Sequence, residues 1–428
     1  MEIIVPIVLL FFSLAFGMPI AFALGVSGLI GLWMVGGLDM LLGIAKTTPH
    51  ESVANFLLTT VPMYILMAEI MTSSGVTKDV FHAAYKWLGR LPGGLGIATV
   101  MSGAGLAAVC GSSTASAATL SASAVPEMKR YGYRTDFALG TVSIAGTLAI
   151  MIPPSIVLII YGILTETGIG ELFIAGIIPG ILTALGYILT ILIWAKRNPG
   201  VAPKVDVAFS WKEKFQSLSG IWPMLLVVIS VIGSIYFGIV TPTEAGALGA
   251  FAAFMIALIM RRLTTNSMMH ALERTLKSTA MILTIVIGAM IFGYYLTATQ
   301  VTQGVVEFVQ NTGVSKWVVL AFVLFLYIIL GMFMDQLAIL ILTLPFTFPL
   351  MVSLGFDPVW FGIIVTKTAE IGLVTPPVGM NVFVAAGAAG EKTATAFQGV
   401  LWFVITDLII LLILVMFPIL STWLPSMM

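Results

Sequence analysis

A pair of adjacent prolines occurs twice inside apolar segments of this chain. The first pair, Pro153-Pro154, lies in AIMIPPSIVLIIYG, and the second, Pro376-Pro377, lies in EIGLVTPPVGMNVFVAAG. Proline has no backbone N–H and its ring clashes with the preceding helical turn, so each pair is expected to break a helix. In hydrocarbon, the carbonyl oxygens freed by such a break need a partner. The two pairs therefore predict two matching sites where bare backbone meets an ion or a substrate.

The composition of the chain places both breaks in a membrane. Hydrophobic residues make up 59% of the 428 residues and charged residues only 9%, against about 25% charged residues in a typical soluble domain. Apolar runs of about 20 residues, long enough to cross a bilayer, recur along the chain. We therefore expect a multi-pass protein surrounded by lipid. The formal net charge of zero disfavours nucleic acid as a partner.

Basic residues are concentrated in a few polar connections. If these connections face the cytoplasm, 16 of the 19 Lys and Arg residues lie inside, as the positive-inside rule expects. Two apolar segments then begin and end on one side of the membrane, 91–128 on the inside and 316–357 on the outside. They are interrupted by CGSSTAS and by LGMFMDQLA, respectively. We expect re-entrant helical hairpins with tips at 110–115 and 331–336, one entering from each face.

The order of these features repeats at a constant spacing. Pro19 in GMPIAFALG and Pro242 in VTPTEAGALG are 223 positions apart (242 − 19), as are Pro153 and Pro376 (376 − 153). The predicted fold class is an all-α polytopic membrane protein with two inverted-topology repeats. Each repeat contains a re-entrant helical hairpin and a Pro-Pro-broken helix, an arrangement typical of secondary transporters.

The remaining segments complete the predicted topology. We expect amphipathic helices at the membrane interface over 75–90, 300–313 and 264–278. The polar stretch 196–218 is expected to link the two halves on the cytoplasmic side. Inversion of the repeats further predicts that 3–35 forms two short helices that fold back near Gly17-Met18-Pro19, with the N-terminus outside.

These expectations divide the chain into a scaffold and a transport domain. In order, the segments are scaffold helices and the first arm (1–90), the first half of the transport domain with hairpin and broken helix (91–165), scaffold helices with the linker and the second arm (166–315), the second half of the transport domain (316–390) and a C-terminal helix (391–428).

The two breaks predict two cation sites. Unwound backbone presents carbonyl oxygens, which are hard ligands suited to sodium, and each hairpin tip precedes its break by the same 44 residues (154 − 110 and 375 − 331). The residues expected around sodium are Cys110, Ala149, Met151 and Pro154 in the first half, and Gly331, Gly372, Thr375 and Val378 in the second. No other cofactor is expected.

An anionic substrate is expected to bind beside these cation sites. Helix N-termini at the tips and breaks carry partial positive charge, and no arginine occurs in either hairpin tip or break. The residues expected to contact the substrate are Ser112, Ser113, Thr114, Val157 and Asn381.

Acidic residues inside apolar segments are further candidates for function. Glu69, Glu244, Glu370 and Asp407 belong to this group. For Glu69 and Glu244, a structural hydrogen bond near a helix end is an equally good interpretation. Asp335 is expected to cap the second helix of its hairpin, with sodium binding as the alternative.

Five motifs, spread over essentially the whole chain, carry a resemblance to a known family. They are GMPIAFALG at 17–25, GSSTASAATL at 111–120, IPPSIVLIIYG at 152–162, TPTEAGALG at 241–249 and EIGLVTPPVGMNVF at 370–383. Together they resemble the large membrane subunit (M subunit) of the TRAP (tripartite ATP-independent periplasmic) transporters.

This resemblance implies an elevator-type, sodium-driven uptake system in a bacterial inner membrane. The substrate would be an organic anion, a carboxylate or a sulfonate, delivered by a periplasmic binding protein (P). A small four-helix membrane subunit (Q) would be a separate chain. The two sodium sites of the family map onto the two sets of four residues above. The family commonly has serine at the position of Cys110 and glycine at the position of Ala149, and alanine loses glycine's access to positive φ.

Other functions fit the sequence less well. An intramembrane enzyme would need a Ser-His or paired-Asp arrangement at membrane depth. No histidine lies in an apolar span, and Asp335 and Asp407 share no paired motif, so no catalytic residue is expected. Re-entrant hairpins also occur in channels, but breaks in both halves favour alternating access. A self-sufficient sodium–carboxylate symporter without a binding protein stays open as the alternative function.

Overall fold

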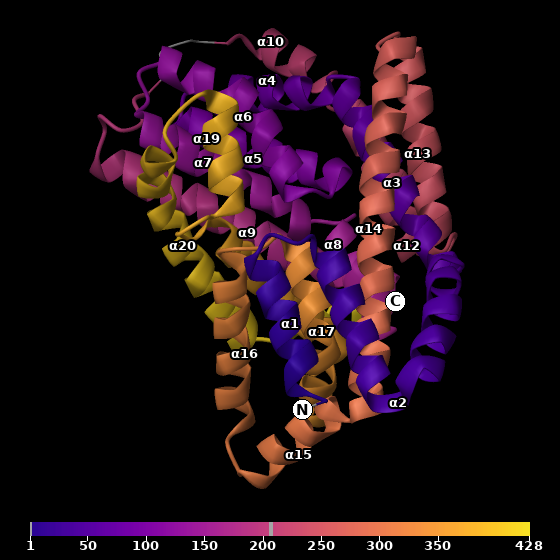
Figure 1. Cartoon of the computed structure of the whole chain (residues 1–428). Coiled ribbons are helices and arrows are strands. Elements are labelled where there is room, and N and C mark those ends of the chain that lie inside the picture. Colours follow the sequence, from indigo (N-terminus) through magenta and orange to yellow (C-terminus); the bar gives the residue numbers. More distant parts are fainter. Residues whose placement is uncertain (1, 205–208) are drawn as a thin grey trace.

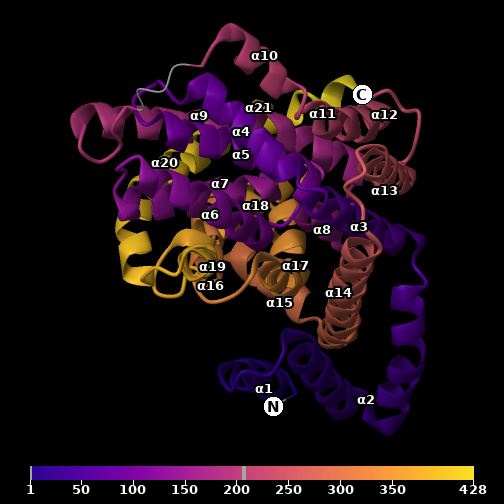
Figure 2. The same cartoon turned by 90° about the horizontal axis from the view of Figure 1, so that it is seen from above.

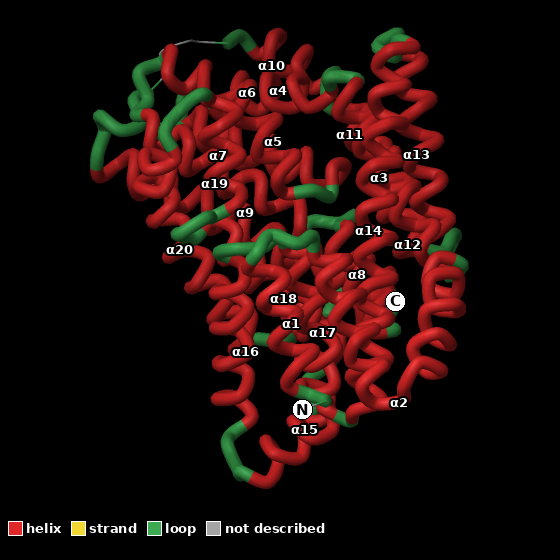
Figure 3. The backbone as a smooth tube through the Cα atoms, in the orientation of Figure 1, coloured by secondary structure: helices red, strands yellow, loops and turns green. Residues whose placement is uncertain are grey.

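The structure, a computed structural model, describes residues 2–204 and 209–428. The regular elements in these residues are helices (Figure 3). Within the same ranges, eight helices are long and apolar enough to cross a bilayer. The multi-pass all-α class expected from the sequence is therefore confirmed. Residues 205–208 of the predicted linker 196–218, and Met1, lie outside the described residues.

The chain begins with two helices that fold back on one another. α1 (Ile4–Ala15) and α2 (Ile20–Val53) are joined by a turn in which Gly17 has a φ of +80°, and they pack together. This agrees with the predicted reversal near Pro19. α2 is itself bent at Gly37, where φ is 68° and ψ is −164°. Seen from above, α1 and α2 extend away from the other helices, with α14 between them and the body (Figure 2).

The prediction of a separate interfacial helix over 264–278 is wrong. These residues form the first half of α14 (Thr265–Thr299), a single 35-residue helix that Thr264 and Ser267 cap. Neither proline nor glycine occurs between Thr265 and Ile287, so nothing ends the amphipathic segment before the apolar one begins. At 1.5 Å per residue the helix is roughly 52 Å long. It therefore exceeds the hydrocarbon core of a bilayer, which is about 30 Å thick.

Each predicted hairpin is a pair of contacting helices. The first is α5 (Gly94–Cys110) with α6 (Ser113–Arg130), and the second is α16 (Lys316–Gly331) with α17 (Gln336–Ser353). Their tips, 111–112 and 332–335, fall inside the predicted windows. The arms that precede them, α4 (Val76–Leu88) and α15 (Val301–Asn311), lie at opposite ends of the molecule (Figure 1).

Both Pro-Pro pairs separate two helices, as expected. α7 (Thr135–Met151) and α8 (Ile156–Thr165) flank the first pair, and α18 (Pro358–Val374) and α19 (Met380–Ala389) flank the second. The peptide bonds within the pairs, Pro153-Pro154 and Pro376-Pro377, are both cis. The breaks are followed by α9 (Ile169–Arg197) and α20 (Thr393–Met416), respectively.

The spacing found in the sequence extends to the helix boundaries. α6 starts at residue 113 and α17 at 336, a difference of 223 (336 − 113). α7 covers 135–151 and α18 covers 358–374, again 223 apart at both ends (358 − 135, 374 − 151). The members of these two pairs thus have the same length and follow one another in the same order.

The remaining helices complete two groups. They are α3 (Thr60–Ser73), α10 (Trp211–Leu218), α11 (Trp222–Val228), α12 (Ser234–Tyr236), α13 (Pro242–Ile259) and α21 (Ile419–Thr422). α2, α3, α13 and α14 pack mainly on one another, whereas α9 and α20 pack on α7 and α18. The core lies in the second group, because every residue of 136–151 and of 360–374 is buried.

Candidate functional site

The tip of the first hairpin lies against the first break. In a regular helix, the carbonyl oxygens of Ala149 and Ile150 would accept from residues 153 and 154, but Pro153 and Pro154 have no N–H to donate. Gly111, at the tip, has a φ of +59°, and a Cβ added to it would lie 3.1 Å from the carbonyl oxygen of Pro154. The hairpin tip therefore lies against the backbone of the first break, at Pro154.

The second half repeats this contact with different atoms. The backbone N–H of Gly379, after the second break, donates to the carbonyl oxygen of Met332 at the hairpin tip over 3.3 Å. Gly331 and Gly372 mark a close crossing of α16 and α18, since a Cβ on Gly331 would lie 2.7 Å from the Cα of Gly372. Thr375 ends α18, and its Oγ1 donates to the carbonyl oxygen of Ile371 over 2.6 Å.

The two halves meet between α19 and the first hairpin. Nδ2 of Asn381 donates a hydrogen bond to Oγ of Ser113, and both side chains are fully buried. Among the described residues, Oδ1 of Asn381 and Oγ of Ser116 are buried without a hydrogen-bond partner. The thiol of Cys110 lies beside Ser116. A group of polar atoms with unused hydrogen-bonding capacity therefore surrounds the first hairpin tip.

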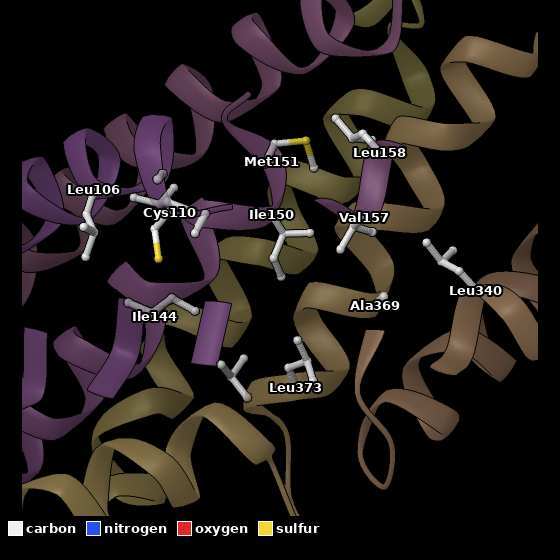
Figure 4. Close-up of a cluster of buried hydrophobic side chains, with 14 of the residues drawn as sticks. Leu106, Cys110, Ile144, Ile150, Met151, Val157, Leu158, Leu340, Ala369 and Leu373 are labelled. Atoms are coloured by element: carbon white, nitrogen blue, oxygen red, sulfur yellow. The ribbon is translucent and has the colours of Figure 1, made fainter. Parts of the chain in front are cut away.

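The predicted residues differ in their exposure. Ala149, Met151 and Pro154 are buried, Ser112 and Thr114 are half-buried, and Val378 is exposed. Val157 is 1% exposed. It belongs to one apolar cluster with Cys110 of α5, Met151 of α7 and Leu373 of α18, parts of which are drawn in Figure 4. A substrate can reach Val157 only if these neighbours move.

The isolated acidic residues have distinct partners. Asp335 accepts from the backbone N–H of Ala338 over 3.1 Å and caps α17, which confirms the predicted cap. Glu244 forms a capping box with Thr241 at the start of α13, so the structural interpretation of Glu244 is confirmed. Oε2 of Glu69 lies 3.6 Å from Nη1 of Arg274, on α14.

A buried polar cluster joins the other two candidate acids, Glu370 and Asp407. Lys367 of α18 lies between them, and Tyr187 of α9 completes the cluster. All four side chains are 0% exposed. Lys367 was not among the residues predicted from the sequence. The sequence did contain a pattern that predicts this ion pair, namely a lysine three positions before a glutamate in an otherwise apolar segment. Residues at i and i+3 lie on the same face of a helix.

A large cavity lies away from these contacts. It encloses about 780 Å³ between the end of α2, the α8–α9 turn and α14, and its lining includes Glu51, Glu166, Glu171 and Tyr294. None of the predicted site residues lines it. The hairpin tips and breaks, rather than cavity size, therefore define the candidate site.

Comparison with known proteins decides the family. The model for "Tripartite ATP-independent periplasmic transporter, DctM component" matches residues 7–420. The chain belongs to this family. This TRAP large permease is 36% identical over 381 residues to the C4-dicarboxylate TRAP transporter large permease protein of Pseudomonas aeruginosa, with 88% of each chain covered. It is 31% identical over 413 residues to the sialic acid TRAP transporter large permease protein of Vibrio cholerae, covering 96% of this chain and 95% of that one.

Two further comparisons concern a longer relative and the fold. The TRAP permease is 33% identical over 417 residues to the isethionate TRAP transporter permease protein of Oleidesulfovibrio alaskensis, and spans 63% of that longer chain. Its structure is similar to the YdaH transporter of Alcanivorax borkumensis, with a TM-score of 0.65 over 90% of this chain and 88% of that chain. At 15% sequence identity, this likeness concerns the fold alone.

Family membership settles the class of protein. The chain is a multi-pass inner-membrane subunit of a TRAP transporter, and the family is a transporter component rather than an enzyme family. The tripartite name places the large permease beside a small membrane subunit and a periplasmic binding protein. Membership of this family does not favour the alternative of a self-sufficient symporter.

Proposed function

We propose that this TRAP large permease uses sodium to drive the import of an organic anion that a periplasmic binding protein delivers. The observation that carries the proposal is the contact of each hairpin tip with a Pro-Pro break, at Gly111 with Pro154 and at Met332 with Gly379. The names of the relatives, which cover C4-dicarboxylate, sialic acid and isethionate, support a carboxylate or sulfonate substrate.

Sodium would bind where proline frees backbone oxygens. The carbonyl oxygen of Ala149 loses its donor at Pro153. The carbonyl oxygen of Gly372 loses its regular helical donor at Pro376 and accepts instead from the N–H of Thr375 over 3.0 Å, which leaves its second lone pair for an ion. Such oxygens are hard ligands, and discontinuous helices in transporters use them for sodium. The first site would comprise Cys110, Ala149, Met151 and Pro154, and the second Gly331, Gly372, Thr375 and Val378. Main-chain ligation would tolerate cysteine and alanine at positions 110 and 149.

The substrate would bind at the first hairpin tip, beside the N-terminus of α6. The first backbone N–H groups of a helix are unpaired and attract an anion. Ser112, Ser113 and Thr114 open this helix, and Asn381 approaches from α19. The unpaired Oδ1 of Asn381 is an acceptor, so it supports a hydrogen-bond donor or a cation beside the anion, whereas the second N–H of Nδ2 could donate to the anion itself. Selectivity among anions would come mainly from the binding protein.

Transport would proceed by an elevator movement of two inverted repeats. The arms at opposite ends of the molecule (Figure 1) and the constant spacing of the helices support this arrangement. The mobile part would contain 91–165 and 316–390. Since α9 and α20 pack mainly on α7 and α18, with only local contacts such as Phe173 to Tyr64 joining α9 to α3, we assign α9 and α20 to the mobile part as well. This moves α9 out of the scaffold predicted for 166–315.

Reconstitution into proteoliposomes tests the proposal. The chain is incorporated with and without a Q subunit, a purified P protein is added outside, and uptake of a labelled C4-dicarboxylate, sialic acid and isethionate is measured in sodium or choline buffer. We expect uptake of one of these anions only when P, Q and sodium are all present. Uptake by the chain alone would contradict the tripartite function, and equal uptake in choline would contradict sodium coupling.

A further inference from the structure

The hydroxyl of Tyr187 is the centre of the buried polar cluster. Tyr187 Oη lies 2.7 and 2.9 Å from the two carboxylate oxygens of Asp407, 3.3 Å from Oε1 of Glu370 and 3.4 Å from Oγ1 of Thr147. These side chains come from four different helices, α9, α20, α18 and α7. A single hydroxyl thus contacts both broken helices and the helices that follow them.

Lys367 completes the cluster with charge. Its Nζ lies 2.5 Å from Oδ1 of Asp407 and 3.3 Å from Oε2 of Glu370, and 5.6 Å from the centre of the Tyr187 ring. Every member is 0% exposed. Burial of charged groups carries a desolvation cost that often exceeds their attraction, so a buried ionic network is weak support for stability alone. A role in positioning explains why the network occupies this place.

The cluster occupies equivalent places in the two halves. Thr147 and Glu370 are 223 positions apart (370 − 147), the spacing of the Pro-Pro pairs. Thr147 precedes Ala149 by two residues, and Glu370 precedes Gly372 by two. Two residues along a helix correspond to about 3 Å. The polar contacts therefore lie within one turn of a proposed sodium ligand in each half.

We propose that Tyr187, Lys367 and Asp407 are positioning residues that couple the two proposed sodium sites. A sodium ion that pulls the end of α7 inward would displace Thr147, and the contacts through Tyr187 would transmit that displacement to Glu370 on α18. The first ion would thereby organise the carbonyls for the second. This inference rests on the proposed function, because it assumes the two cation sites. It adds that they are cooperative and names the side chains that link them.

The test uses Tyr187→Phe with Tyr161→Phe as its matched control. Each variant removes one hydroxyl from a fully buried tyrosine, and the hydroxyl of Tyr161 donates to the carbonyl oxygen of Pro358, outside the cluster. Uptake is measured against sodium concentration in the reconstituted complex. For Tyr187→Phe, we expect the half-saturating sodium concentration to rise about 5-fold or more, the scale of a typical coupling free energy. The Hill coefficient should fall towards one, while Tyr161→Phe retains both wild-type values.

A second measurement separates coupling from general stability. Thermal unfolding of the purified wild-type and Tyr187→Phe proteins is followed over a range of sodium concentrations, with choline as the reference. An ion that binds only the folded state raises the unfolding temperature once its concentration exceeds its dissociation constant. The inference predicts that Tyr187→Phe needs more sodium for the same upward shift. A variant that unfolds earlier in choline but keeps the wild-type sodium midpoint and Hill coefficient would overturn the coupling alone. If neither uptake by the wild-type complex nor its unfolding temperature depends on the sodium concentration, the proposed function and this inference are both overturned.

Discussion

Asn381 of α19 donates a hydrogen bond to the hydroxyl of Ser113 at the start of α6, although 268 residues separate them in the chain. At the opposite end of the same helices, Lys129 and Glu391 form an ion pair. The segment after the second break is therefore bonded to the first hairpin's second helix near both ends of that helix. The two halves share one structural unit rather than lying side by side as separate bodies.

Loss of the Asn381 amide should weaken substrate binding. In Asn381→Ala, the half-saturating substrate concentration is expected to rise roughly 10-fold, because a hydrogen bond to a charged group contributes about 1.5–3 kcal/mol. Uptake kinetics of the reconstituted complex measure this. The exposed Asn311, at the end of α15, provides the control Asn311→Ala, which should behave as wild type. Equal substrate half-saturation in the two variants would remove Asn381 from the substrate site.

The close crossing of α16 and α18 at Gly331 and Gly372 should make the stability of the fold sensitive to any side chain added at Gly331. A Cβ on Gly331 would lie 2.7 Å from the Cα of Gly372, so Gly331→Ala is expected to destabilise the fold by about 1–3 kcal/mol through overpacking. A Cβ added to Gly304 of α15 would meet no atom within 4 Å, and Gly304→Ala should be neutral or slightly stabilising. Thermal unfolding in detergent compares the two. An unaltered unfolding temperature for Gly331→Ala would disprove the tight crossing.

Restoring a backbone donor at each break should weaken sodium binding. Pro153→Ala supplies an N–H for the carbonyl oxygen of Ala149, and Pro376→Ala supplies a second N–H for that of Gly372, beside the N–H of Thr375. Each variant is expected to raise the half-saturating sodium concentration about 10-fold, which corresponds to roughly 1.4 kcal/mol. Pro199, in the exposed loop after α9, serves as control in Pro199→Ala. Sodium-dependent uptake that matches the control in both break variants would place the ions elsewhere.

Two substitutions at Asp335 distinguish its cap from a sodium ligand. Asparagine is as good an N-cap as aspartate, whereas alanine costs about 1 kcal/mol at such a position. Because Asp335 accepts from the N–H of Ala338, Asp335→Asn should keep wild-type unfolding temperature and sodium dependence, and Asp335→Ala should lower the unfolding temperature only. A large rise in the sodium requirement of Asp335→Asn would instead assign the carboxylate to the ion.

The local features of the fold were predictable because their causes are local. Pro153 and Pro376 remove N–H donors wherever they occur in a helix, and the small polar run after Cys110 ends an apolar helix without regard to its neighbours. The boundaries of both hairpins and both breaks therefore follow the sequence closely. The full length of α14 was not predicted because an amphipathic segment and an apolar segment can follow one another within a single helix. In the structure this long helix packs against α2.

By itself, the sequence determined a multi-pass helical protein with two proline-broken helices, each preceded by a hairpin, and it carried the motifs of the family. Hydrophobicity and proline chemistry act over a few residues, so a pattern of residues is enough to reveal them. Only the tertiary structure decided that Asn381 meets Ser113, and that Lys367 lies between two buried carboxyl groups beside Tyr187. These contacts depend on which helix faces pack together. That choice rests on packing and hydrogen bonding between residues far apart in the chain, and no local pattern encodes it.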